Sequence, residues 1–284
     1  MNVRILTVPY DSGVRGVRMG RGPEHLLGRG LQATLAKGGH EVAIETIGIE
    51  VAGLPLEVGG AFQLNRLLAD RVRAAVSAGA LPVVLAGNCN TAAGTLAGIG
   101  PERTGVFWFD SHGDLNTPDT TGSGFFDGMA LAMVTGRCWS RLTTGIPGFL
   151  PVPDGHVVLA GARDLDPAEE ALLEGSEIRV ISPRSLQGGG MELERALSAL
   201  AARVRRLYVH IDLDVLDRDQ TPANQFAAPG GPTVAEMTEA LRVIGARIPV
   251  AAVAVTAYDP SFDPEGRAAD AAFTLLEATL AAAR

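Results

Sequence analysis

Residues 81–87 read LPVVLAG, and residues 251–256 read AAVAVT. In each stretch nearly every position is apolar, so both faces would be apolar if the chain were extended there. Strands that are apolar on both faces are typical of a parallel sheet covered by helices on each side. These two stretches therefore predict a three-layer α/β fold.

Similar short runs of aliphatic and β-branched residues recur along the chain and give eight predicted strands. They are residues 4–8, 42–47, 82–86, 105–110, 156–160, 178–181, 207–212 and 251–256. Between several of them lie stretches with a period near 3.6, which is typical of helices. The predicted helices are residues 24–36, 61–78, 191–204, 233–244 and 268–283. Because no linker or internal repeat divides the chain, we expect a single domain over residues 1–284 with a parallel sheet of about eight strands.

The composition excludes several classes of protein. The chain has 24 Lys plus Arg against 32 Asp plus Glu, a formal charge of −8, which argues against nucleic-acid binding. Its two cysteines are too few for a disulfide framework, so we expect a reducing, cytoplasmic location. The N-terminal residues lack a secretion signal, and no apolar stretch is long enough to cross a membrane. We therefore expect no nucleic-acid or membrane partner.

Two carboxylate-rich motifs directly follow predicted strands. Residues 110–114 read DSHGD and residues 210–214 read HIDLD, so in each motif alternate side chains share one face of an extended chain. Either motif alone would often be a chance loop pattern, but both follow strands of one predicted sheet. Clustered carboxylates repel one another unless cations neutralise them, and oxygen ligands with an imidazole suit manganese or a similar ion. The candidate ligands of a metal pair are Asp110, His112, Asp114, Asp212 and Asp214.

Three segments resemble the main motifs of a known family. They are WFDSHGDLNTPDTTGSG (108–124), ARDLDPAE (162–169) and HIDLDVLDRDQTPA (210–223), which resemble the arginase and agmatinase family, the ureohydrolases. The resemblance implies a parallel eight-stranded α/β fold and two divalent metal ions, in this family Mn²⁺. It also implies hydrolysis of a guanidino or amidino group of a small molecule, and a possible homo-oligomer.

The resemblance assigns five of six metal ligands to the residues named above, and the sixth departs from the family pattern. Where the family has a histidine, residues 87–90 read GNCN, so the candidate ligand is Cys89. A thiolate can bind a divalent metal, although it is softer than imidazole. The alternative is that Cys89 is only a small buried side chain. A cysteine at this position resembles the hydroxyarginine amidinohydrolase branch of the family.

The resemblance also implies a binding site for an amino-acid end of the substrate. Asn116 and Ser123 match the positions that hold the α-carboxylate, and Asp166 matches the contact to the α-amino group.

Two positions near the chemistry depart from the family pattern. Asp127 stands where the proton-relaying histidine is found, and Ala257 stands where a glutamate grips the guanidinium. Asp127 could act as a general acid or base if burial raises its pKa, or it could be an exposed loop carboxylate. Tyr258 and Asp259 could supply the missing contact, or they could form a turn before Pro260.

These observations predict a dinuclear-metal hydrolase that cleaves a C–N bond of a guanidino or amidino group and releases urea or a related fragment. The expected catalytic residues are Asp114, Asp127 and His210, and His210 is expected to orient a metal-binding carboxylate. One alternative is a hydrolase of a hydroxyguanidine or formimidoyl compound, for which the missing glutamate matters less. A second alternative is a catalytically silent relative that binds a metal or a metabolite.

Overall fold

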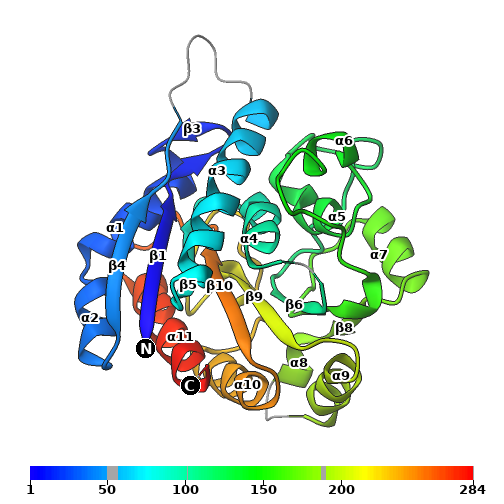
Figure 1. The fold of residues 1–284 in the computed structure, drawn as a ribbon. Helices are drawn as coiled ribbons and strands as arrows, with labels where there is room; N and C mark the ends of the chain where they lie inside the picture. Colours follow the sequence, from blue (N-terminus) through cyan, green and yellow to red (C-terminus); the bar gives the residue numbers. More distant parts are fainter. Residues whose placement is uncertain (50–56, 101, 187–189, 284) are drawn as a thin grey trace.

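The computed structural model describes residues 1–49, 57–100, 102–186 and 190–283. A sheet of eight parallel strands crosses the molecule in the order β4-β1-β5-β10-β9-β6-β7-β8 (Figure 1). The strands are β1 (Asn2–Val8), β4 (Glu41–Thr46), β5 (Leu81–Ala86), β6 (Thr104–Phe109), β7 (Val157–Ala160), β8 (Arg179–Ile181), β9 (Arg206–Asp212) and β10 (Val250–Thr256). Each of the eight predicted strands is confirmed, with ends that differ by two residues at most.

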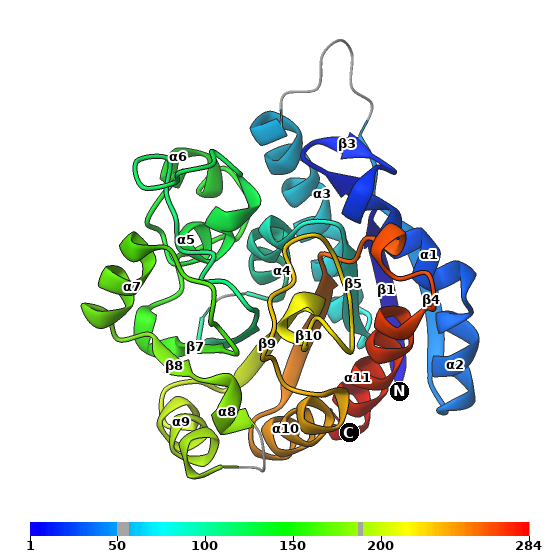
Figure 2. The same cartoon turned by 180° about the vertical axis from the view of Figure 1, so that it is seen from behind.

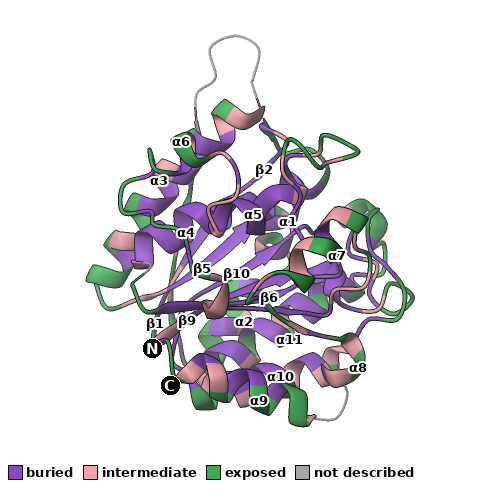
Figure 3. Ribbon diagram, turned by 90° about the vertical axis from the view of Figure 1, so that its right-hand side faces the viewer, coloured by how far each residue is buried: buried purple, intermediate pink, exposed green. Residues whose placement is uncertain are grey.

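Helices cover both faces of this sheet (Figure 3). One face packs against α3 (Glu57–Ser77), α4 (Ala92–Ile99) and α5 (Ala130–Val134). The other packs against α1 (Gly22–Gly28), α2 (Leu31–Lys37), α8 (Pro183–Leu186), α9 (Met191–Ala201), α10 (Val234–Arg247) and α11 (Arg267–Ala282). Alternate residues of β6 point to opposite faces of the sheet. Phe107 and Phe109 belong to the apolar core under α9 and α10, and Trp108 belongs to the core under α3 and α4. The three-layer prediction is confirmed.

Shorter elements lie mostly in the loops at the ends of the strands. The remaining α-helices are α6 (Ser140–Thr143) and α7 (Pro167–Glu174), and a small antiparallel ribbon is formed by β2 (Tyr10–Asp11) and β3 (Val14–Arg15). The 3₁₀ turns are η1 (Arg18–Arg21), η2 (Cys89–Thr91), η3 (Asp127–Met129), η4 (Asp154–His156), η5 (Leu213–Val215) and η6 (Pro260–Phe262). Seen from behind, the loop between β9 and α10 crosses in front of the central strands (Figure 2).

One helical prediction is corrected, and one buried helix lies outside the predicted set. The single helix expected over residues 24–36 is two helices, because Gly30 between them has φ +97, a left-handed conformation that ends a helical run. Helix α4 was not predicted, because all eight of its residues are buried and its sequence AAGTLAGI has no polar face to give a period. In the described part of the chain no helix is long and apolar enough to span a membrane.

Candidate metal centre

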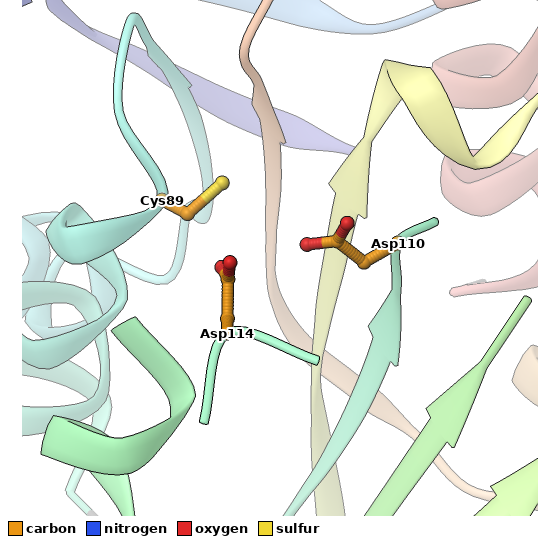
Figure 4. Close-up of side chains that lie close together, drawn as sticks. All are labelled: Cys89, Asp110 and Asp114. Atoms are coloured by element: carbon orange, nitrogen blue, oxygen red, sulfur yellow. The ribbon is translucent and has the colours of Figure 1, made fainter. Parts of the chain in front are cut away.

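The carboxyl ends of β5, β6 and β9 bring the candidate ligands together. Ligand atoms of Cys89, Asp110 and Asp114 lie within 4.8 Å of one another, and their side chains point toward a common centre (Figure 4). Ligand atoms of Asp110, His112 and Asp214 form a second group within the same distance. Because Asp110 belongs to both groups, the arrangement suits two neighbouring cations that share one carboxylate.

The loop after β6 is held largely by hydrogen bonds of its own motif and of its partner motif after β9. The backbone N–H of His112 donates to Asp110 Oδ1 at 2.8 Å. The hydroxyl of Ser111 donates to Asp214 Oδ1 at 2.8 Å. Asp114 has φ +52, a left-handed conformation that is unusual for a residue with a Cβ and that marks a locally constrained site. The two carboxylate motifs therefore fix each other.

The buried carboxylates of this cluster repel one another, and bound cations would reduce the repulsion. Burial and the neighbouring carboxylates raise the pKa values of Asp110, Asp114 and Asp212. Burial alone would lower the pKa of His112, but the carboxylates of Asp214 and Asp110 outweigh it and raise that pKa to about 10. The buried Oδ2 atom of Asp114 has no hydrogen-bond partner in the described part of the chain. Divalent cations would relieve the repulsion and pair this oxygen, so the residues present fit a metal pair.

The loop after β5 is held instead by a distant carboxylate. Asp127 accepts hydrogen bonds from the Asn88 side chain, from the backbone N–H of Cys89 and of Asn90, each at 2.9 Å, and from the Asn90 side chain at 3.2 Å. Burial raises the pKa of Asp127 to about 7, although these hydrogen bonds oppose the shift. Asp127 is 5% exposed, so it is not an exposed loop carboxylate. Its carboxylate orients the loop that carries Cys89.

Gly87 allows this loop to lie close to the N-terminal segment. A Cβ at Gly87 would lie 2.2 Å from the carbonyl oxygen of Tyr10, so only glycine fits. Cys89 is buried, as its alternative interpretation required, but it also faces the other candidate ligands. Its sulfur donates to Asp212 Oδ2 at 3.0 Å and lies 3.2 Å from Thr256 Oγ1.

His210 lies behind the centre, fully buried on β9. Its Nδ1 lies 2.8 Å from the hydroxyl of Tyr208, and its Nε2 lies 3.1 Å from Thr256 Oγ1. Burial lowers the pKa of His210 to about 3, so the ring is neutral. The expected contact with a metal-binding carboxylate is replaced by one with Thr256, because both nitrogens of the ring point to hydroxyl groups. His210 thus reaches the cluster through Thr256 and Cys89.

A cavity of about 430 Å³ opens above the cluster. Of the candidate ligands, Cys89, His112, Asp114, Asp212 and Asp214 line it, and so do Asp127, Asn116, Ser123 and Asp166. The Asn116 side chain donates to Asp166 Oδ2 at 2.8 Å, while Asp166 also caps α7 in a capping box with Glu169. The three residues expected to hold an amino-acid end of the substrate therefore line the same cavity as the cluster.

Two predicted substrate contacts lie elsewhere. Ala257 lines the cavity and has φ +58, a left-handed conformation. The hydroxyl of Tyr258 donates to Asp263 Oδ2 at 3.0 Å. Asp259 accepts from Arg21 at 2.9 Å. Neither Tyr258 nor Asp259 lines the metal cavity, although Asp259 lines a neighbouring hollow that shares Phe125 and Phe226 with it. That these two residues replace the missing glutamate stays a prediction.

Several residues that shape the site carry no sequence signal for it. The Trp108 indole donates to Asp110 Oδ2 at 3.1 Å, although its sequence context reads as core. Arg163 donates to backbone carbonyls that include those of Asp214 and Ala228, and so it holds the loop after β9. Because every residue has a backbone carbonyl, the sequence does not indicate which residues accept from Arg163. Phe125 and Phe226 stack at 5.3 Å between ring centroids and line the cavity from two separate loops.

Comparisons with known proteins find related sequences and related folds. The model of the Arginase family matches residues 1–281. An arginase of Brevibacillus brevis is 31% identical over 97% of this chain and 96% of its own, and one of Bacillus caldovelox is 32% identical over 75% and 73%. The crystal structure of an arginase from Bacillus cereus superimposes with a TM-score of 0.88 at 26% identity, covering 98% of both chains. A formimidoylglutamase from Bacillus subtilis shares the fold at 20% identity, with a TM-score of 0.75 over 99% and 86% of the two chains.

Proposed function

Because the chain belongs to the arginase family and is a hydrolase of the ureohydrolase type, we propose that it cleaves a C–N bond in the guanidino or amidino group of a small, amino-acid-like molecule. The observation that carries the proposal is the pair of ligand groups that share Asp110 and whose other members line the cavity. We propose Mn²⁺ for both positions, because carboxylate oxygens dominate the donor set.

The proposed ligands divide between two ions. One ion would be held by Cys89, Asp110 and Asp114, and the other by Asp110, His112 and Asp214, with Asp212 beside both groups. When bound, two divalent ions polarise the reacting groups and lower the pKa of water for attack on a planar carbon. The chain's own part is to hold these ligands rigidly and to bury them.

The polar residues Asn116, Ser123 and Asp166 of the cavity lining would orient the substrate. The Asn116 amide and the Ser123 hydroxyl are neutral donors suited to a carboxylate, and the Asp166 carboxylate is an acceptor suited to an ammonium group. This set matches the zwitterionic end of an amino acid. The roles of Asp127 in protonating the leaving amine and of His210 in catalysis stay predictions.

The apolar part of the cavity lining favours a less cationic reacting group than the guanidinium of arginine. Ala257, Met19, Phe125 and Phe226 belong to this part of the lining. A carboxylate at position 257 would supply a charge-assisted hydrogen bond of about 1.5 to 3 kcal/mol, and alanine supplies none. This observation favours a second candidate function, hydrolysis of a hydroxyguanidine or a formimidoyl compound.

A mass-spectrometric screen of the manganese-loaded protein tests the proposal. The panel is arginine, hydroxyarginine, agmatine, guanidinobutyrate and formimidoylglutamate, with Asp114→Asn as the inactive control. We expect turnover of at least one compound and its loss in the control. Turnover of hydroxyarginine or formimidoylglutamate above arginine would support the second candidate, and Ala257→Glu should then shift the preference toward arginine. Silence across the panel with two ions bound would overturn the proposal in favour of a catalytically silent relative.

A further inference from the structure

We infer that Tyr208, His210 and Thr256 form a directed hydrogen-bond chain that presents the Thr256 hydroxyl as a donor to the sulfur of Cys89. These three would then be positioning residues for a thiolate ligand. The inference rests on the proposed role of Cys89 in the metal centre, and it adds residues that lie outside the ligand motifs.

The hydrogen-bond chain involves two neighbouring strands. Tyr208 and His210 lie two residues apart on β9 and therefore face the same side, while Thr256 ends the adjacent strand β10 in register with Asp212. The successive contacts are 2.8 Å from the Tyr208 hydroxyl to His210 Nδ1, 3.1 Å from His210 Nε2 to Thr256 Oγ1, and 3.2 Å from Thr256 Oγ1 to Cys89 Sγ. None of the first three side chains has measurable exposure, so water does not compete for these hydrogen bonds.

The Tyr208 hydroxyl determines which atoms donate and which accept along the hydrogen-bond chain. In the described part of the protein, the acceptor within reach of the Tyr208 hydroxyl is His210 Nδ1, so the phenol donates there. A neutral imidazole that accepts at Nδ1 carries its proton on Nε2, and that proton points at Thr256 Oγ1. The oxygen of Thr256 is thereby occupied as an acceptor.

The last step places the hydroxyl proton of Thr256. Its nearer acceptor is Cys89 Sγ at 3.2 Å, and the carbonyl of Ile211 lies at 3.4 Å. The thiol of Cys89 itself donates to Asp212 Oδ2, which leaves the sulfur free to accept from Thr256. When a metal replaces the thiol proton, the same hydroxyl remains directed at the sulfur.

The imidazole ring of His210 is held in place by stacking. The ring of His210 stacks on Trp108 at 3.6 Å between centroids, with 10° between the planes. The Trp108 indole also donates to Asp110, the carboxylate common to both ligand groups. The same buried stack therefore supports the sulfur on one side and the shared carboxylate on the other, and it prevents the ring from turning away from Thr256.

The hydrogen-bond chain would tune the charge and the direction of the Cys89 sulfur. A thiolate brings a negative charge where imidazole would bring none, and a hydrogen bond to the sulfur withdraws part of that charge from the metal. It also fixes the side chain of Cys89 in the direction of Asp110 and Asp114. Partners of this kind raise metal affinity by about 10- to 100-fold.

Titration with Co²⁺ tests the inference without measuring turnover, because a thiolate bound to cobalt gives a charge-transfer absorption in the near ultraviolet. Thr256→Val removes the hydroxyl and keeps the branched shape, and Thr256→Ser restores the hydroxyl. We expect the valine variant to shift this absorption and to bind the first or second equivalent of Co²⁺ about 10- to 100-fold more weakly, with recovery in the serine variant. Identical absorption and affinity in the valine variant and the parent protein would overturn the inference.

Two further variants separate the possible failures. Tyr208→Phe removes the group that sets the tautomer of His210, so we expect a smaller loss of affinity in the same direction, and no change there would also count against the chain. Thermal unfolding of the metal-free variants shows whether the fold is intact. If Cys89→Ser leaves the absorption unchanged, Cys89 is not a ligand and the inference is wrong, whereas a silent substrate screen with the absorption present contradicts only the proposed function.

Discussion

The loops after β5 and β6 both deliver candidate metal ligands, but they are held in different ways. The loop after β6 is closed by short-range bonds such as that from the His112 N–H to Asp110, and by bonds to the matching motif after β9. The loop after β5 is held by Asp127, which lies 37 to 39 positions further along the chain. One loop is held by the two ligand motifs themselves, and the other depends on a carboxylate outside those motifs.

This difference explains which ligands can be recognised from spacing. Alternate positions in DSHGD and HIDLD already specify one face of a strand end, so the ligand set and the local geometry come from the same residues. Cys89 has no such pattern around it, and its direction depends on Asp127 on one side and Thr256 on the other. A ligand whose geometry is set by distant residues is recognised by family resemblance or by structure.

The largest effect is expected at the carboxylate that both ligand groups share. Asp110→Asn should lower the metal content from about two ions per chain to below about one, and should abolish turnover, because each group loses the carboxylate charge that the two share. Elemental analysis after dialysis against manganese measures this. Asp119→Asn, in the exposed part of the same loop, is the matched control and should keep both ions. Retention of two ions by Asp110→Asn would show that the two groups are independent.

A smaller but still large effect is expected when Asp127 is replaced. Asp127→Asn replaces a carboxylate that accepts four hydrogen bonds by an amide that turns a donor toward some of the same donors. We expect the free energy of unfolding of the metal-free protein to fall by about 2 to 4 kcal/mol, as measured by urea denaturation. In the manganese-loaded protein, the ion on the Cys89 side should be lost before the ion on the His112 side. A change below about 0.5 kcal/mol would mean that the loop after β5 keeps its shape without Asp127.

The sequence predicts most of the sheet and the ligand positions, and it fails where long-range packing decides. All eight sheet strands follow from local hydrophobic patterns, whereas α4 is buried on every side and so shows no period. The cluster around Asp110 follows from spacing. The left-handed conformation of Ala257 and the hydrogen bond from Tyr258 to Asp263 have no such local signal, because left-handed backbone is uncommon in residues other than glycine. Buried partners such as Thr256 read as ordinary strand residues.

The smallest effect is expected within the loop after β6. Ser111→Ala removes the hydroxyl that donates to Asp214 Oδ1, but the backbone N–H of Ser111 also reaches that oxygen at 3.3 Å, and the His112 N–H still closes the loop on Asp110. We therefore expect the free energy of unfolding to fall by only about 0.5 to 1.5 kcal/mol, with both manganese ions retained. The same urea and metal measurements apply, so the two loops are compared on one scale. If Ser111→Ala cost as much as Asp127→Asn, the loop after β6 would depend on a single residue as the other loop does. The contrast between a loop held by the ligand motifs and a loop held by a residue outside them would then be lost.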